Sequence, residues 1–339
     1  MSPVPNKTLR WGIAGSGRIC NDFVVAMMTL PKDEHEVVAV ASRHEFKAQE
    51  FASRLSIRKF YGSYEALAKD PEVDVVYIGA INTEHKKLCL MMLQHDKHVL
   101  CEKPLTLRLA ESKELFDYAR KKGKFLMEAI WTRCFPAYKQ LREEILKQSI
   151  GPVQLLTANF GFHAPNVPNL AERDLGGGIL LNVGCYVVQL ANLVFQDRKP
   201  ATVKAVATFN ESGVDHTTAI TLQYDDGAIA QFLVSMLTDL ESTARIVGKE
   251  GLVIEIGAPF LAPTQLKTPS EEFHYKLPFV DEKFPLNFIN SSGLAFEADE
   301  VRRCILAGKT ESPLMSEADS LLSAEIIDAI CKEIRLNYD

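Results

Sequence analysis

The residues of this 339-residue chain that could carry out chemistry gather in two short segments. The first is a glycine turn, Gly15-Ser16-Gly17-Arg18-Ile19-Cys20, which follows a short apolar run. The second is Glu102-Lys103-Pro104, which ends another apolar run. Backbone N–H groups at such a turn bind a pyrophosphate, and a lysine at the carboxyl edge of the same parallel sheet can reach the bound ligand. Together the two segments predict a dinucleotide-dependent oxidoreductase.

The glycine turn departs from the dinucleotide fingerprint at one position. Gly15 and Gly17 match its first two glycines, and Arg18 and Ile19 follow at the expected start of a helix. Cys20 stands where a third glycine usually lets the helix and the strand pack closely. Cysteine is small enough to be tolerated there, and a tight turn without a ligand is the alternative interpretation.

The end of the second expected strand selects between the two nicotinamide cofactors. An acidic residue at this point binds the ribose hydroxyls of NAD, whereas an arginine accommodates the 2′-phosphate of NADP. The chain has Ser42 and Arg43 there and no acid. This pattern favours NADP, and the alternative for Arg43 is a solvated surface arginine.

The elements that must position these segments follow from the hydrophobic periodicity. Residues 1–130 are expected to form an α/β, doubly wound parallel-sheet (Rossmann) domain with strands at 9–14, 36–41, 73–79, 98–101 and 125–127. Residues 131–339 are expected to form an α+β domain with a large, open, mainly antiparallel sheet. Its strands are predicted at 153–162, 203–209, 217–224, 228–237 and 243–247, and its helices at 138–147, 185–195, 295–306 and 317–334.

Bulk properties exclude several classes of protein. The formal charge of -6 gives no broad basic surface for nucleic acid. No apolar run is expected to be long enough to cross a membrane, and the first ten residues have no signal-peptide core. Seven cysteines without a C-x-x-C pair predict reduced thiols and no metal site. A soluble, cytoplasmic protein is therefore expected.

Several motifs resemble the glucose-fructose oxidoreductase (Gfo/Idh/MocA) family, and the resemblance covers nearly the whole chain. They are the glycine turn, Asn82-Thr83-Glu84-His85, the run from His98 to Leu105, and Gly176-Gly177-Gly178 followed by Asn182-x-Gly184-x-Tyr186. The segments Leu9–Ile13 and Met127–Arg133 and the tyrosine at 186 resemble the branch that oxidises trans-dihydrodiols and D-xylose with NADP.

The resemblance implies that Lys103 and Tyr186 are a catalytic pair. Oxidation of an alcohol needs a base for the hydroxyl proton, and a tyrosine with a pKa of about 10 is only about 0.1% ionised at pH 7. The ammonium of Lys103 would favour the phenolate. Most relatives have an aspartate where this chain has Asn182, which can orient a substrate but cannot take a proton. If that aspartate is mainly a hydrogen-bond acceptor, the amide oxygen can replace it.

The resemblance also implies further site residues. Asn82, His85 and Glu102 would lie near the nicotinamide, although Ile81 replaces the proline usual before that asparagine; an exposed histidine is the alternative for His85. Four aromatic residues would line an apolar substrate pocket or, alternatively, fill cores: Trp131, Phe160, Phe260 and Phe288. The three glycines at 176–178 indicate a tight loop.

We therefore expect an NADP-dependent dehydrogenase that oxidises a hydroxyl of a trans-dihydrodiol or of a pyranose sugar. By analogy with relatives it would be a homodimer that pairs through the outer face of the second sheet, where residues 228–237 would expose apolar side chains. One rival is a cofactor-binding regulator without turnover, which Asn182 favours and Lys103 and Tyr186 oppose. The other is a reductase of a different carbonyl substrate, although such relatives usually have histidine at the position of Tyr186.

Overall fold

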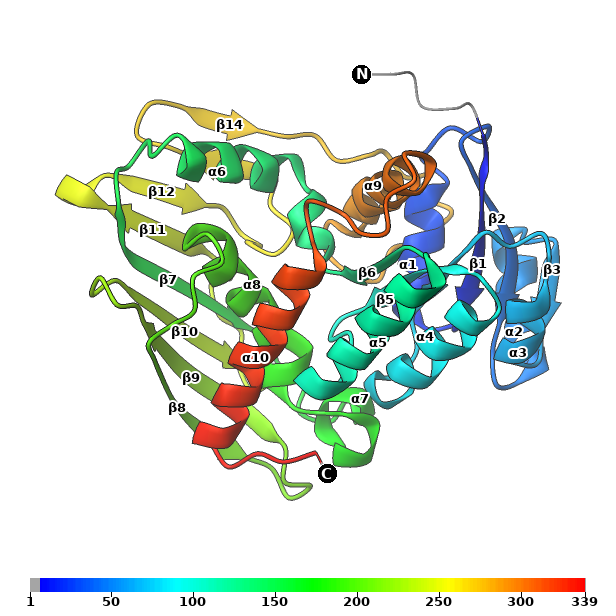
Figure 1. The fold of residues 1–339 in the computed structure, drawn as a ribbon, viewed down its shortest axis with the longest axis horizontal. Coiled ribbons are helices and arrows are strands. Elements are labelled where there is room, and N and C mark those ends of the chain that lie inside the picture. Colours follow the sequence, from blue (N-terminus) through cyan, green and yellow to red (C-terminus); the bar gives the residue numbers. More distant parts are fainter. Residues whose placement is uncertain (1–6, 339) are drawn as a thin grey trace. The chain divides into compact units, whose positions relative to one another are not determined.

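The computed structural model describes residues 7–338, which form two compact units (Figure 1). Within the described residues, the first unit comprises 7–106, Ala110–Cys134 and Leu277–Glu317. The second comprises Leu107–Leu109, Phe135–Lys276 and 318–338. The division predicted at residue 130 therefore differs from the structure, because residues 277–317 return to the first unit. The cause is tertiary: α9 (Leu294–Leu306) packs against α1 (Arg18–Met27) and η2 (Trp131–Cys134).

The first unit is built on a six-stranded parallel sheet in the order β3-β2-β1-β4-β5-β6, which confirms the predicted doubly wound domain. Its strands are β1 (Leu9–Ala14), β2 (His35–Ala41), β3 (Lys59–Tyr61), β4 (Val75–Ile78), β5 (His98–Glu102) and β6 (Leu126–Ala129). The central strands are nearly continuous apolar runs because both faces of such a sheet are covered. The strand order reverses between β1 and β4, beside the glycine turn, which is where α/β sheets bind ligands.

Helices of the first unit alternate with these strands. They are α1, α2 (Glu45–Leu55), α3 (Tyr64–Lys69), η1 (Asn82–Glu84), α4 (His85–Gln94), α5 (Leu109–Lys122), η2, η6 (Ser291–Gly293) and α9. Helix α1 buries Phe23, whose ring stacks on that of Tyr77 from β4 with centroids 3.8 Å apart. This packing fixes the helix whose first turn begins at the two glycines.

The second unit has an eight-stranded sheet in the order β14-β13-β12-β11-β7-β10-β9-β8. Its strands are β7 (Val153–Gly161), β8 (Thr202–Phe209), β9 (Asp215–Gln223), β10 (Ile229–Ser235), β11 (Ala244–Gly248), β12 (Val253–Ile256), β13 (Gln265–Lys267) and β14 (Glu272–His274). Neighbouring strands are antiparallel except β7 and β10, so the predicted mainly antiparallel sheet is confirmed. The last three strands were not predicted from the sequence because they are short.

The helices of the second unit are α6 (Pro136–Leu146), α7 (Pro168–Ala171), η3 (Arg173–Leu175), the π-helical turn η4 (Leu180–Gly184), α8 (Cys185–Val194), η5 (Lys249–Gly251) and α10 (Glu317–Glu333). Among the described residues, the helical run Arg173–Val194 is long and apolar enough to cross a membrane. The expectation that no run would qualify was therefore wrong. However, 94% of its most apolar window is buried inside the protein, as in the core helix of a globular domain.

Candidate active site

The glycine turn leads directly from β1 into α1. Gly15 has a φ of +130°, and a Cβ there would lie 2.6 Å from the carbonyl oxygen of Gly79, so a side chain is excluded. Gly17 is the N-cap of α1, and a Cβ built on it would meet no atom within 4 Å. The protein's own packing therefore does not require glycine at 17. It leaves open space in front of unpaired helix N–H groups, a geometry that suits an anionic group.

The position of the missing third glycine is filled by Cys20, and a glycine elsewhere compensates for it. The Sγ atom of Cys20 lies 3.4 Å from the carbonyl oxygen of Gly79, just after β4. A Cβ at Gly79 would lie only 2.4 Å from that sulfur. The close approach of helix and sheet is therefore retained with glycine at 79 instead of 20. Burial raises the pKa of the Cys20 thiol to about 12, so it stays protonated.

The residues expected to select the cofactor lie just after β2. Ser42 is buried and its backbone N–H donates to the carbonyl oxygen of Tyr61, 3.1 Å away. Arg43 is exposed and lies near Tyr64. Burial raises the pKa of the Tyr64 hydroxyl, and the Arg43 cation partly opposes that rise. An exposed cation therefore stands at the end of β2.

Strand β5 ends at Glu102, directly before Lys103. The Glu102 carboxylate is buried and accepts hydrogen bonds from the Tyr77 hydroxyl, at 2.6 Å, and from the backbone N–H of Lys103, at 3.3 Å. Burial raises the pKa of Glu102, and the Lys103 charge opposes the rise. Glu128 of β6 accepts the N–H of Leu105 at 2.9 Å. Two buried acids thus hold the backbone on either side of Lys103 and Pro104, and sequence reasoning missed Glu128 and Tyr77.

His85 contacts the same loop, at the carbonyl oxygen of Pro104. It is fully buried, which excludes the alternative of an exposed histidine. Its Nδ1 lies 2.7 Å from the carbonyl oxygen of Pro104 and its Nε2 lies 3.2 Å from that of Ala80. Burial lowers the pKa of His85 and favours the neutral ring, which can donate to only one of these two carbonyl oxygens at a time. Asn82 is half-buried at the start of η1, three residues before this histidine.

Tyr186 lies in the first turn of α8 within the second unit and is 7% exposed. The ring of Phe160 from β7 lies 6.4 Å from that of Tyr186 at 69°, and Phe260 lies 6.2 Å from Phe160 at 87°. Three of the residues predicted from the sequence thus form one aromatic cluster. Phe260 is completely buried and supports Phe160, which is half-buried. The other two predicted aromatics, Trp131 and Phe288, belong to the first unit, as does Lys103.

Asn182 lies in η4, the π-helical turn that precedes Tyr186. Its Nδ2 donates to the carbonyl oxygens of Gly178, at 2.8 Å, and Gly176, at 3.3 Å. Gly178 has a φ of +102°, and a Cβ at Gly177 would lie 2.6 Å from the nearest carbonyl oxygen. The three glycines therefore form the tight loop that the sequence predicted. An amide can donate to these carbonyl groups, and an ionised aspartate cannot.

Asp215 and Tyr338 hold the same loop and were missed by sequence reasoning. Asp215 accepts the N–H of Leu180, at 3.0 Å, and the hydroxyl of Thr218, at 2.6 Å. The Tyr338 hydroxyl donates to the carbonyl oxygen of Gly177 at 2.6 Å. Isolated polar residues at a strand start and near the end of a chain give no signal of this role. Their contacts fix the start of the helix that carries Tyr186.

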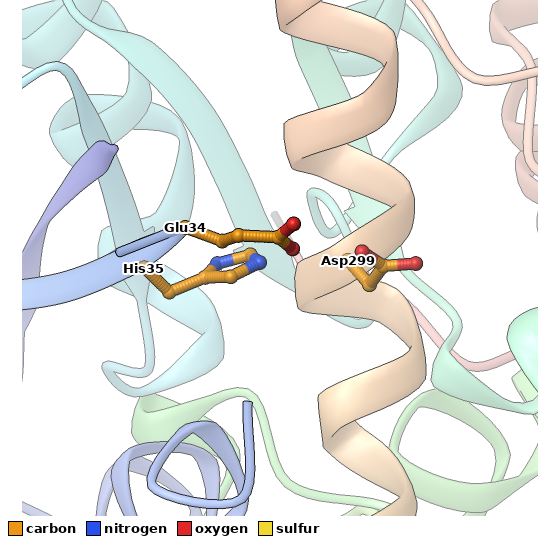
Figure 2. A group of neighbouring side chains, drawn as sticks. All are labelled: Glu34, His35 and Asp299. Carbon is orange, nitrogen blue, oxygen red and sulfur yellow. The ribbon is translucent and has the colours of Figure 1, made fainter. Parts of the chain in front are cut away.

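One group in the described part of the chain has the residue types of a metal site: Glu34, His35 and Asp299 (Figure 2). Its ligand atoms lie within 4.8 Å of one another. However, His35 Nδ1 accepts a hydrogen bond from the indole N–H of Trp11 at 3.3 Å, so the ring proton is on Nε2. Burial and the Arg302 cation lower the pKa of His35 to about 4, so the ring stays neutral. A protonated Nε2 and a nearby guanidinium make this group unsuited to a cation.

Comparison with known proteins agrees with both units. Residues 9–130 match the oxidoreductase family with an NAD-binding Rossmann fold, GFO_IDH_MocA, and residues 138–254 match the GFO/IDH/MocA C-terminal domain. The chain is 44% identical to trans-1,2-dihydrobenzene-1,2-diol dehydrogenase of Xenopus laevis, over 97% of this chain and 99% of that protein. It is 40% identical to the Homo sapiens protein of the same name, over 97% and 98%.

Solved structures share the fold. The 3-ketoreductase KijD10 from Actinomadura kijaniata, solved with NADP and TDP-benzene, is 24% identical with a TM-score of 0.79 over 97% of this chain and 98% of that one. Levoglucosan dehydrogenase, solved with NADH and levoglucosan, is 21% identical with a TM-score of 0.80 over the same shares. The matched domains and the close relatives together show that this chain belongs to the GFO/IDH/MocA oxidoreductase family, with an NAD(P)-binding Rossmann domain.

Proposed function

We propose that the protein is an NADP-dependent dehydrogenase that oxidises a CH–OH group of a trans-dihydrodiol or of a pyranose sugar such as D-xylose. The observation that carries this proposal is the 40–44% identity, over 97% of the chain, to relatives named trans-1,2-dihydrobenzene-1,2-diol dehydrogenase. Lys103 and Tyr186, which the chemistry needs, are both present. Two features support the proposal, each within its own unit. Buried acids hold the backbone around Lys103, and the ring of Phe160 packs against that of Tyr186.

The cofactor would be held by the glycine turn and the end of β2. The open space at Gly17 and the positive end of α1 suit a pyrophosphate bound by the backbone of Gly15, Gly17, Arg18 and Ile19. Exposed Arg43, with Ser42 beside it and no acid in place, suits the 2′-phosphate of NADP. Glu102, Asn82 and His85 would shape the nicotinamide end by fixing the loop around Lys103.

The reaction removes a hydride and a proton from one CH–OH group and leaves a carbonyl. A bound NADP supplies the hydride acceptor at nicotinamide C4. Tyr186 takes the hydroxyl proton, and the Lys103 ammonium holds the same oxygen and favours the phenolate form of Tyr186. Asn182 acts through the backbone, because its amide fixes the turn before Tyr186.

An apolar ring would suit the side of the site that Phe160 forms next to Tyr186. Trp131, which is buried in η2 of the first unit, is proposed as another apolar residue that binds the substrate. Phe260 would act from behind by supporting Phe160. This aromatic character supports a cyclic diol as the substrate class.

A cytoplasmic homodimer is part of the proposal. The sheet of the second unit exposes Val206 by 72% and Leu233 by 38%, and Leu155 from β7 by 38%. A groove of about 400 Å³ on this sheet is lined by residues that include Leu233, Thr157 and Arg245. Apolar side chains on an open sheet face favour its burial against a second copy. Light scattering of the purified chain, and of Val206→Lys as a disruptive variant, tests this part.

Absorbance of NADPH tests the activity. The wild type is expected to reduce NADP with a trans-dihydrodiol or with D-xylose, and Lys103→Met and Tyr186→Phe are expected to lose at least about a hundredfold in kcat. Both variants should still bind NADP, which isothermal titration measures. Binding of NADP without turnover of either substrate or of a panel of polyols would favour the regulator instead. Turnover of another carbonyl substrate alone would favour the reductase.

A further inference from the structure

We propose that Asp22 is a positioning residue for the cofactor. Its carboxylate accepts hydrogen bonds from residues 285–291, a segment far away in the sequence, and holds this segment against the first turns of α1. This segment carries Phe288 onto the guanidinium of Arg18, beside the glycine turn. The inference rests on the proposed binding of NADP at that turn and assigns a role to residues outside the expected fingerprint.

The Asp22 carboxylate is completely buried in α1 and is the hub of this contact. Its two oxygens accept the backbone N–H groups of Asn287, at 2.9 and 3.0 Å, and Phe288, at 2.9 Å. They also accept the Asn287 side-chain amide at 2.7 Å and the Ser291 hydroxyl at 2.6 Å. Asn21 donates to the carboxylate from the neighbouring position at 3.0 Å. A charged acceptor with this many donors from one segment holds that segment strongly.

Two further hydrogen bonds join the segment to the start of α1. The Asn287 amide donates to the carbonyl oxygen of Arg18 at 3.3 Å, and the Asn21 amide donates to that of Pro285 at 3.2 Å. The next turn of the chain, η6, also packs against α1. The segment is therefore fixed to the very turn of α1 that begins at Gly17.

Phe288 is the part of the segment that reaches the expected cofactor site. The Cζ atom of Arg18 lies 5.2 Å from the centroid of the Phe288 ring, within the range of a cation–π contact. Arg18 is exposed, and Phe288 and Ile289 are 40% and 65% exposed. The ring restricts the arginine at a helix N-terminus that already favours anions. A cation held in place loses less side-chain entropy when it meets a phosphate.

The consequence is a predicted effect on affinity without a matching effect on chemistry. In Asp22→Asn, the amide can accept with one oxygen only and presents two donors to N–H groups, so the segment is released. Phe288→Ala keeps the segment in place and removes only the ring. Both variants are expected to raise the Kd for NADP, by roughly three- to tenfold. In Asp22→Asn, whose carboxylate is buried within α1, kcat at saturating NADP is expected to change by less than about twofold.

Isothermal titration of the full chain with NADP, combined with thermal melts, tests the inference. Asp74→Asn is the matched control, because Asp74 accepts the Arg10 guanidinium at 2.7 and 2.9 Å in the same unit, at the amino end of β1. Asp74→Asn should have a lower Tm than the wild type and an unchanged Kd for NADP. Ser291→Ala, which removes one donor of the hub, serves as a milder variant if Asp22→Asn does not fold.

A double-mutant cycle decides whether Asp22 acts through Phe288. The effects of Asp22→Asn and Phe288→Ala on the Kd should be non-additive, with the double variant no weaker than Asp22→Asn alone. Variants that lower Tm but bind NADP as the wild type does, or effects that simply add, would overturn the inference while the proposed function stands. A wild type that binds neither NADP nor NAD would overturn both.

Discussion

The side-chain amide of Asn182 donates to the carbonyl oxygen of Gly178 across 2.8 Å, and this bond joins the turn before Tyr186 to the tri-glycine loop. A second bond from the same amide reaches Gly176. The amide at position 182, where the resemblance implied an aspartate, therefore faces carbonyl acceptors that only a hydrogen-bond donor can satisfy. This chain uses residue 182 to fix the loop, which does not require the residue to take a proton.

Asn182→Asp is expected to lower kcat rather than raise it, by about tenfold at pH 8. The ionised carboxylate would face two carbonyl oxygens and loosen the turn that carries Tyr186. As the pH falls, the kcat of the variant relative to that of the wild type should partly recover, because a protonated carboxyl can donate again. The pH profile of kcat measures this effect.

A control for that experiment is Asn210→Asp, whose amide donates to the carbonyl oxygen of Ala171 at 2.8 Å in the same unit. It should change Tm without changing the shape of the profile. A large rise in activity of Asn182→Asp would contradict the prediction and identify the natural chain as a weakened catalyst.

Gly79→Ala is expected to destabilise the first unit by about 1–3 kcal/mol, because the new methyl group would overlap the Cys20 sulfur. Cys20→Gly/Gly79→Ala should recover much of the loss by restoring the usual third glycine of the fingerprint. Thermal melts of the two single variants and the double variant measure the coupling. Purely additive losses would show that the two positions do not share this contact.

Two histidines, buried His35 and half-buried His98, are expected to make the protein less stable in mild acid. Burial lowers the pKa of His35 and of His98 to about 4 each, against about 6.5 in the unfolded chain. Between pH 6.5 and 4 the unfolded state therefore binds more protons, so stability falls as the pH falls, by up to about 1.4 kcal/mol per pH unit for each histidine. Calorimetry between pH 7.5 and 5 measures the slope.

His98→Gln provides the comparison for that slope. His98 Nδ1 accepts the backbone N–H of Phe125 at 2.9 Å, and a glutamine oxygen can accept it as well. The variant should show a shallower dependence of Tm on pH below 6.5. An unchanged slope would mean that His98 does not stay neutral in the folded protein.

Glu297→Gln is expected to stabilise the protein at high pH and to have little effect at low pH. Both carboxyl oxygens of Glu297 are buried without a hydrogen-bond partner among the described residues. Burial first, and then the nearby Glu102 charge, raise the pKa of Glu297 well above its usual value. A folded carboxyl with a raised pKa costs stability as the pH rises above its unfolded pKa.

Melts of the wild type and Glu297→Gln at pH 5 and pH 9 test this prediction. The difference in Tm should favour the variant at pH 9 and be much smaller at pH 5. Glu65→Gln is a suitable control, since Glu65 is exposed and pairs with Lys69 across one helical turn. If the variant is less stable than the wild type at pH 9, the ionised carboxylate of Glu297 makes a stabilising interaction, which would contradict the prediction.

Much of the first unit was predictable because its determinants are local in the sequence. The strand Leu9–Ala14 matches the prediction to the residue, since a strand buried on both faces must be a continuous apolar run. The turn at Gly15 was equally predictable, because few residue types tolerate its positive φ and the proximity of the Gly79 carbonyl oxygen. The helix Leu109–Lys122 follows from its own periodicity. Composition and motifs therefore determined the fold class, the family and the residues to inspect.

Other features were decided only by the tertiary structure. Three of them depend on contacts between residues up to 269 positions apart. They are the packing of Cys20 against Gly79, the hydrogen bonds that Asn182 donates, and those that Asp22 accepts from residues 287–291. The short strands β12, β13 and β14 likewise depend on pairing with neighbours rather than on a pattern of their own. Hydrophobic periodicity indicates which side chains of a segment are buried and which are exposed, and local motifs indicate its backbone conformation. They do not indicate which distant groups donate hydrogen bonds to a buried carboxylate or which side chains fill a space. Tertiary packing alone determines those contacts.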